Sequence, residues 1–326
     1  KISAGLKELE DLKKQLAKAT SPDTMYSKLK EEKLSIHLSE EILGYIDPDS
    51  EIDEEELVAE TVKTRLKLTE ELGFVIPRIV FKDDENLNPY EFSIKIHGVN
   101  VFTATVYPNF LMFFADDLHT EKKIKNSISA IDEITGHKIV WVEKDKTKDF
   151  WQKGLSGSEF IARALEFCAT KYVDDLLDYE ELDKYIDVVS AANEFLITNV
   201  VPDFVSLADL RYILTSLIRE KISIKDIVFI FEKINDFAEE SAKSDLINKI
   251  RLSLSRKICN ANKNEDGVIC AFEISDKTMD KFVPNFEEGD DSIVRINAAF
   301  AEKFANKLKK KAIELNITEP KLLVPI

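Results

Sequence analysis

The side chains best suited to acid–base or nucleophilic chemistry are few and scattered in this sequence. None of the four histidines stands near a serine or cysteine in a known nucleophile motif; they are His37, His97, His119 and His137. HExxH, CxxC, GxSxG and P-loop patterns are absent from the chain. Carboxylate pairs carry little information, because 61 of the 326 residues are acidic. The residues therefore predict a protein that is not an enzyme and uses no cofactor. An unrecognised hydrolase, the minority alternative, would need a cleft where acid, base and donor groups converge.

The densest cluster of possible metal ligands is the run DPDSEIDEEE at residues 47–56. A calcium loop requires glycine at its sixth position and a bidentate glutamate at its twelfth. Ile52 and Val58 stand at those positions, so we predict no metal site. The better interpretation is the acidic start of a helix, with Asp53 as N-cap and Glu56 completing a capping box.

Gly154 and Gly157 suggest a loop that binds phosphate, but GLSGS lacks the strand-then-glycine fingerprint of such loops. Ser156 and Glu159 instead have the spacing of a capping box. We expect them to begin a helix that extends from 157 to about 173.

Composition limits the class of protein further. The formal net charge is −16, which argues against binding to nucleic acid or anionic membranes. The three cysteines are Cys168, Cys259 and Cys270, and their scatter favours free thiols over a disulfide frame or a zinc site. No apolar run approaches the ~20 residues of a membrane span. We expect a soluble fragment of a longer protein, with two or more domains.

The stretch from Glu70 to Val101 shows most clearly how the chain should fold. The helix from the acidic run is expected to reach Leu72, with Gly73 as its left-handed C′ residue. Gly98 should supply the positive φ of a short hairpin. The helix should carry an apolar stripe at Val58, Val62 and Leu66. Alternation of apolar and polar residues predicts strands at 34–38, 79–82, 92–96, 99–106, 109–115 and 138–142.

The pattern of apolar residues changes after about residue 175. From Tyr179 to Asn260 the periodicity predicts only helices with short connections. Two of these helices should begin at capping pairs, Ser206 with Asp209 and Ser223 with Asp226. The apolar residues from Ile247 to Ile258 should line another helix. Later elements are expected as a strand at 268–272, a helix over 293–308 and a strand at 321–326.

Near the start, a narrow leucine stripe predicts a helix over residues 3–19; its members are Leu6, Leu9, Leu12 and Leu16. Nothing nearby in sequence obviously receives this stripe. The segment is either a linker helix or a segment that docks on a neighbouring molecule, and in the second case these leucines form an oligomer contact.

Several motifs together resemble the cytosolic region of the FHIPEP family, the FlhA/InvA-type export gate proteins of type III secretion. ELGFVIP followed by an acidic turn and IHGV is similar to the family's central stretch. KIVWV resembles a family strand, and SEFIARAL resembles a family helix opening. LIREKISIKDIVFIFEKINDFA, from Leu217 to Ala238, matches the family almost position by position. The resemblance is collinear from about Leu34 to Ile326, and His97-Gly98-Val99 is closer to the flagellar branch.

The resemblance implies an elongated α+β protein of several subdomains after a linker helix at 1–29. A first α/β subdomain would comprise 30–103 plus 153–177, with a small α/β subdomain inserted at 104–152. A helical subdomain would cover 178–258. A C-terminal α/β subdomain would begin at 259 and be incomplete at 326.

The resemblance also implies a function. Family members form a homo-oligomeric ring at the cytoplasmic side of the bacterial inner membrane, which they enter through N-terminal helices that are absent here. They bind export chaperone–substrate complexes and communicate with the export ATPase stalk and the substrate-switching export protein. A docking platform of this kind is the first expectation, and a purely structural ring element is the alternative.

In the family, chaperones bind a cleft between the first subdomain and its insert. The family turn Asp-Pro-Ala-Phe-Gly would fall on residues 132–136, which keeps Asp132 and Gly136 but places Thr135 where the aromatic belongs. The family's Ala-Thr-His-Leu would fall on residues 162–165, with Arg163 replacing threonine. The implied site is therefore Asp132, Ile134, Thr135, Gly136 and Arg163. Either Ile134 takes the apolar role beside Arg163, or the chaperone differs, or this copy has diverged; Asp132 could also lie in a plain surface turn.

Overall fold

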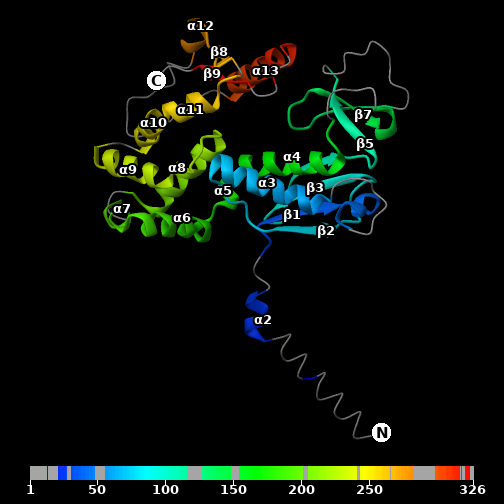
Figure 1. Ribbon diagram of the computed structural model, residues 1–326, viewed down its shortest axis with the longest axis horizontal. Helices are drawn as coiled ribbons and strands as arrows, with labels where there is room; N and C mark the ends of the chain where they lie inside the picture. Colours follow the sequence, from blue (N-terminus) through cyan, green and yellow to red (C-terminus); the bar gives the residue numbers. More distant parts are fainter. Residues whose placement is uncertain are drawn as a thin grey trace.

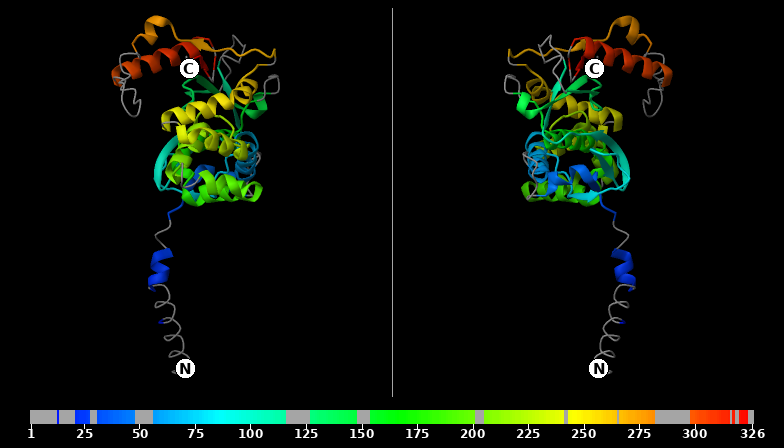
Figure 2. Two further views of the ribbon diagram at one scale, coloured as in Figure 1. Left: turned by 90° about the vertical axis from the view of Figure 1, so that its left-hand side faces the viewer. Right: turned by 90° about the vertical axis from the view of Figure 1, so that its right-hand side faces the viewer.

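The computed structural model describes residues 13, 21–27, 31–47, 56–115, 127–147, 154–200, 205–240, 243–264, 266–281, 298–315, 317 and 320–323. This part of the chain forms a mixed helix-and-sheet protein with three small sheets of four, three and two strands. The expected α+β class is confirmed. Figures 1 and 2 show that α2 (Pro22–Ser27) lies apart from the body formed by the later elements.

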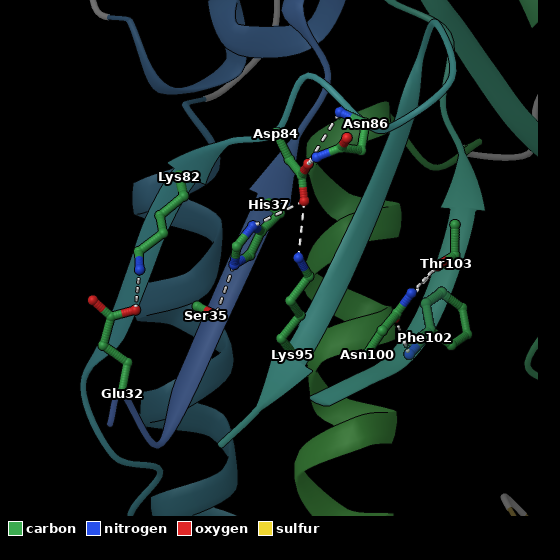
Figure 3. Close-up of polar contacts among 10 residues, drawn as sticks. All are labelled: Glu32, Ser35, His37, Lys82, Asp84, Asn86, Lys95, Asn100, Phe102 and Thr103. Atoms are coloured by element: carbon green, nitrogen blue, oxygen red, sulfur yellow. Dashed lines mark hydrogen bonds and ion pairs between the residues drawn. The ribbon is translucent and has the colours of Figure 1, made fainter. Parts of the chain in front are cut away.

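The four-stranded sheet has the order β2-β1-β3-β4. Its strands are β1 (Leu34–Leu38), β2 (Ile79–Asp83), β3 (Glu91–Ile96) and β4 (Val99–Thr105). Leu34, Ile36, Phe92 and Ile94 are fully buried, as their alternation predicts. The helices α3 (Leu57–Leu72) and α4 (Gly157–Lys171) cover one face of this sheet, and Figure 3 views the opposite, polar face.

Local signals determine the ends of several elements. His97 and Gly98 have φ values of 46° and 73°, which gives the hairpin between β3 and β4 the two left-handed residues of a type I′ turn. Gly73 ends α3 with φ 72°, as expected. Ser156 and Glu159 form the predicted capping box of α4.

The three-stranded sheet has the order β5-β7-β6, from β5 (Phe110–Phe114), β7 (Lys138–Glu143) and β6 (Ile128–Ile131). Trp141 on the central strand is 1% exposed and belongs to the core. Its ring lies 5.6 Å from that of Phe160 on α4 and 5.7 Å from that of Tyr107. This sheet therefore shares a core with the helix that follows it in sequence.

Between Tyr179 and Ala261, the described residues form helices and no strand, as predicted. These helices are α6 (Tyr179–Ala192), α7 (Glu194–Val200), α8 (Leu207–Arg219), α9 (Ile227–Phe237), η3 (Ala238–Glu240), α10 (Lys243–Ser253) and α11 (Ser255–Ala261). The two-stranded sheet pairs β8 (Phe272–Glu273) with β9 (Leu322–Leu323), beside α12 (Asp276–Met279) and α13 (Ala298–Glu314).

Two predicted helix starts are wrong. The helix α3 has Glu56 rather than Asp53 at its N-cap, without a side-chain capping bond. The helix α9 begins after Asp226, so Ser223 lies outside it and caps nothing. In contrast, Ser206 and Asp209 form a complete capping box at α8. The same Ser-x-x-Asp spacing therefore begins α8 but not α9, so this spacing alone does not fix where a helix starts.

The apolar stripe expected on α3 does not face the core. Val58, Val62 and Leu66 are 37%, 47% and 57% exposed, whereas the buried face carries Leu57 and Leu68 with polar residues between them. Two further expectations also fail: the line Ile247–Ile258 is divided between α10 and α11, and the strand expected at 268–272 is reduced to Phe272–Glu273. The leucines at 6–16, Asp53 and His119 lie outside the described residues.

Candidate functional site

The structure joins Asp132 to Arg163, although they are 31 positions apart in sequence. Asp132 follows β6, and Arg163 lies on α4. The guanidinium donates two hydrogen bonds to the carboxylate, Nη1 to Oδ1 at 3.1 Å and Nη2 to Oδ2 at 2.9 Å. A bidentate pair of this kind constrains both distance and orientation. It therefore fixes the end of β6 against the helix.

The same carboxylate organises the turn that follows it. Ile134 N donates to Oδ1 at 3.3 Å, and Thr135 N donates to Oδ2 at 3.2 Å. The Thr135 hydroxyl also bonds Oδ2. The backbone closes the turn through Gly136 N to Asp132 O at 2.7 Å and Asp132 N to His137 O at 2.9 Å. The carboxylate and backbone of Asp132 thus hold residues 132–137 in their turn conformation.

The side chain of Asp132 is 0% exposed, although the turn that follows it lies at the surface with Glu133 exposed. Burial is the strongest influence on the pKa of its carboxyl and raises it. The hydrogen bonds from Arg163 and Thr135, with the Arg163 charge, outweigh burial and hold the pKa below its usual value. The carboxylate is therefore ionised and fully committed to its partners.

Neighbouring rings complete the setting of the pair. The Arg163 guanidinium carbon lies 5.5 Å from the centre of the Phe114 ring, a cation–π distance. Phe114 also meets His137 edge to face at 6.1 Å. Ile134 is partly buried against the core, and Gly136 has φ 76° with Lys309 of α13 beside it. The aromatic ring beside Arg163 therefore belongs to Phe114 of β5 and not to residues 132–136.

All five predicted site residues therefore lie around one turn, but they differ in accessibility. Asp132 is enclosed, whereas Ile134, Thr135 and Gly136 are partly exposed and Arg163 keeps 26% of its side chain accessible. A ligand would contact the apolar and hydroxyl side chains of the turn rather than the carboxylate. The residue that sequence reasoning missed is Phe114, which alternation placed correctly in a strand without indicating that it lies against Arg163.

A second polar cluster lies on the open face of the four-stranded sheet (Figure 3). Ser35 Oγ is 3.1 Å from His37 Nε2, and His37 Nδ1 is 3.3 Å from Asp84 Oδ2. The sequence places no histidine beside a serine or cysteine in a recognisable nucleophile motif, and the contact of His37 with Asp84 appears only once β1 and the loop after β2 come together. Burial and the neighbouring Lys95 lower the pKa of His37.

The geometry of this cluster does not match acyl transfer. Ser35 is 3% exposed, and β1 is an interior strand paired on both sides, which commits its amides to the sheet rather than to an oxyanion hole. Asp84 also accepts from Lys95 Nζ at 2.8 Å and from Asn86 N and Nδ2. Because both oxygens of the Asp84 carboxylate already accept hydrogen bonds, the carboxylate stabilises the sheet edge.

The described part of the chain contains no group of three or more His, Cys, Asp or Glu side chains arranged to hold a metal. Within the same residues, no helix combines the length and apolar character needed to cross a bilayer.

Comparison with solved structures shows the fold. The chain is similar to the CdsV protein of Chlamydia pneumoniae, with TM-score 0.71, 18% identity and coverage of 86% of this chain and 82% of that one. It is also similar to the MxiA protein of Shigella flexneri, with TM-score 0.68, 17% identity and coverage of 91% and 94%. The nonameric EscV cytosolic domain from a type III secretion system matches with TM-score 0.64 and 16% identity over 89% and 82%.

Among curated proteins, the chain is similar to the flagellar biosynthesis protein FlhA of Bacillus subtilis, with 23% identity over 81% of this chain and 39% of the relative. FlhA of Escherichia coli is 25% identical over 62% of this chain and 30% of the relative. The matched region thus covers about a third of the length of these relatives. A sequence model of the FHIPEP family matches residues 3–325. The chain accordingly belongs to the FHIPEP family.

Proposed function

We propose that this chain is a docking platform of a type III protein export gate, on the cytoplasmic side of the bacterial inner membrane. The observation that carries the proposal is the turn 132–136, which Arg163 holds against α4 beside partly exposed Ile134 and Thr135. Family membership supports the assignment, because the resemblance aligns the family's chaperone-binding turn with residues 132–136.

The similar proteins support the proposed partners and assembly. A structure of Chlamydia pneumoniae CdsV together with CdsO matches this chain with TM-score 0.68 at 17% identity, covering 86% of this chain and 84% of that one. The EscV match is nonameric. We propose by analogy a homo-oligomeric ring that receives chaperone–substrate complexes and contacts the export ATPase stalk and the substrate-switching protein. Its curated relatives, named FlhA, favour the flagellar system.

The proposed function is non-enzymatic. The cluster of Ser35, His37 and Asp84 has the spacing of a hydrolytic triad, but its serine is 3% exposed and its carboxylate already accepts from Lys95 and Asn86. Binding of other proteins requires none of these groups to react.

The test of the docking site is titration calorimetry of the chain with a cognate chaperone bound to its export substrate. Ile134→Asp should weaken binding at least tenfold, because it puts a charge on the apolar part of the turn. Val99→Asp is the matched control, since Val99 is 64% exposed at the start of β4, on the other sheet. Equal affinities for the two variants would rule out this turn. Charge reversal at Asp132 or Arg163 is unsuitable here, because their buried pair also supports the fold.

The second candidate is a purely structural ring element, which the leucine stripe at 6–16 favours. Deleting residues 1–20 and measuring mass by light scattering at high protein concentration separates the candidates. Loss of the ring with unchanged chaperone affinity assigns those leucines to assembly. A ring that persists removes them from it.

A further inference from the structure

The edges of a sheet present unpaired backbone N–H and C=O groups that can pair with another chain, and proteins usually protect them. In the described residues, the four-stranded sheet ends at β2 and β4, and the three-stranded sheet ends at β5 and β6. These four edges differ in how they are protected against pairing with another strand. One of them has none of the usual protective features.

Three of the edges are guarded. The strand β2 carries Lys82 and Asp83, and Lys82 pairs with Glu32 at 2.6 Å (Figure 3). The strand β4 is distorted by a register shift opposite Ile94 and Lys95, where Asn100 Oδ1 accepts from Phe102 N (Figure 3). The strand β5 is bridged by residue 155, with Met112 N to Leu155 O at 2.7 Å and the return bond at 2.9 Å.

The fourth edge, β6, has the sequence Ile-Ser-Ala-Ile. It contains no charge, no proline and no bulge, and it pairs with β7 alone. The bond from Asp132 N to His137 O identifies which residues of β6 face β7. Because antiparallel pairs alternate, Ala130 and Ile128 also face β7, while the backbone groups of Ser129 and Ile131 point away from the sheet. Within the described residues, no partner strand reaches them.

The side chains at this edge suit an added strand. Ile131 is 61% exposed, an unusual exposure for a β-branched apolar residue at an open edge. Ser129 and Ile131 line a shallow hollow of about 380 Å³ with Ala115, Lys138 and Val140. A strand added beside β6 would place alternate side chains along the rim of this hollow.

The position of the edge indicates its occupant. Ile131 is followed directly by Asp132, so a strand paired with β6 would end at the turn proposed to bind chaperones. A row of alternating donors and acceptors is satisfied by extended polypeptide rather than by a small molecule. The net charge of −16 disfavours an acidic segment.

We propose that β6 receives an extended, uncharged segment of the export substrate as an added antiparallel strand, while its chaperone rests on the adjacent turn. This assignment of the occupant rests on the proposed docking function. The pairing itself depends only on the edge chemistry of β6.

The pairing is tested by amide exchange and nitrogen-15 NMR on the whole chain. The probe is the blocked peptide Thr-Val-Thr-Ile-Thr-Val, and its control is the same peptide with alternate amides N-methylated, which removes donors. In the free chain, Ala130 should exchange slowly and Ser129 and Ile131 rapidly. The unmodified peptide should slow exchange at Ser129 and Ile131 at least tenfold, and the methylated peptide should not. Protection of both amides in the free chain, by its own residues or by a second copy at higher concentration, would overturn the proposal.

Two variants make the result specific. Ser129→Pro removes an outward donor without removing a ladder bond, and Ile131→Lys adds a charge to the edge. Each should weaken binding of the peptide and of the chaperone–substrate complex at least tenfold, whereas Val99→Lys at the guarded β4 edge should weaken neither. Unchanged binding in both edge variants contradicts the proposal even if Ile134→Asp still weakens chaperone binding. Conversely, the edge variants could lose peptide binding while Ile134→Asp has no effect on chaperone binding. That result would contradict the proposed chaperone site at residues 132–136 and support strand addition at β6.

Discussion

Asp132 and Arg163 form a bidentate ion pair in which the carboxylate is fully enclosed and the guanidinium is partly exposed. The pair connects the three-stranded sheet to α4, a helix of the first sheet's core. The two residues are also the charged members of the predicted binding site. Substituting either of them would therefore change both the binding site and the stability of the fold.

The first prediction concerns the stability that this pair provides. Arg163→Met should lower the free energy of unfolding by about 3 kcal/mol, because it leaves the enclosed Asp132 carboxylate without its cation. The control is Lys67→Met, which removes a surface pair with Glu166 at 2.9 Å and should cost under ~1 kcal/mol. Urea unfolding followed by circular dichroism measures both. Equal losses would show that the buried pair has no special role.

The second prediction concerns pH. Because the folded state lowers the pKa of Asp132, its contribution to stability is present above the unfolded pKa of about 3.9 and is lost as pH falls through the folded value. The wild type should therefore lose its advantage over Asp132→Asn progressively below about pH 4. Urea titrations of both proteins between pH 3 and pH 7 measure the difference. An advantage that stays constant over that range would contradict the assignment.

The third prediction compares two glycines with nearly equal φ. A Cβ on Gly73 would lie 2.7 Å from Lys225 N, whereas a Cβ on Gly98 would meet nothing within 4 Å. Gly98→Ala should cost about 1 kcal/mol for its left-handed backbone. Gly73→Ala should cost clearly more, because the α8–α9 connection must also move. Thermal unfolding of both variants gives the order, and the reverse order would show that the close approach is not tight.

The fourth prediction concerns the junction between α3 and the helical region. Tyr185 on α6 donates its hydroxyl to Gly73 O at 2.9 Å and accepts from Val75 N at 3.1 Å. Tyr185→Phe should lower stability by about 1–2 kcal/mol, because two backbone groups lose their partner. Tyr212→Phe is the control, since Tyr212 is 56% exposed. Hydrogen exchange at Val75 should rise only in the first variant.

The fifth prediction concerns the thiols. Cys168 is fully buried, and burial raises its pKa to about 12, whereas Cys259 and Cys270 are exposed. A thiol reagent such as Ellman's should therefore modify two cysteines in the folded chain at pH 8 and the third only on unfolding. Rapid reaction of all three would place Cys168 outside the core.

Short-range patterns in the sequence predicted the elements well where both partners of an interaction lie within one turn. The capping boxes at Ser156 and Ser206 and the left-handed Gly73 belong to this class. Alternation placed the strands around Ile36, Ile94 and others because side chains on a strand reach the core at every second position. The family's turn could be aligned with residues 132–136 for the same reason, since its residues are contiguous.

The tertiary structure alone decided which surfaces meet. The apolar stripe of α3 at Val58, Val62 and Leu66 faces outward, while the opposite face, with Leu57 and Leu68, is buried. Likewise, no local pattern connects Asp132 to Arg163 or shows that β6 pairs only with β7 among the described residues. Contacts between distant segments depend on how helices and sheets dock, and docking is a property of whole faces that periodicity within one segment does not contain.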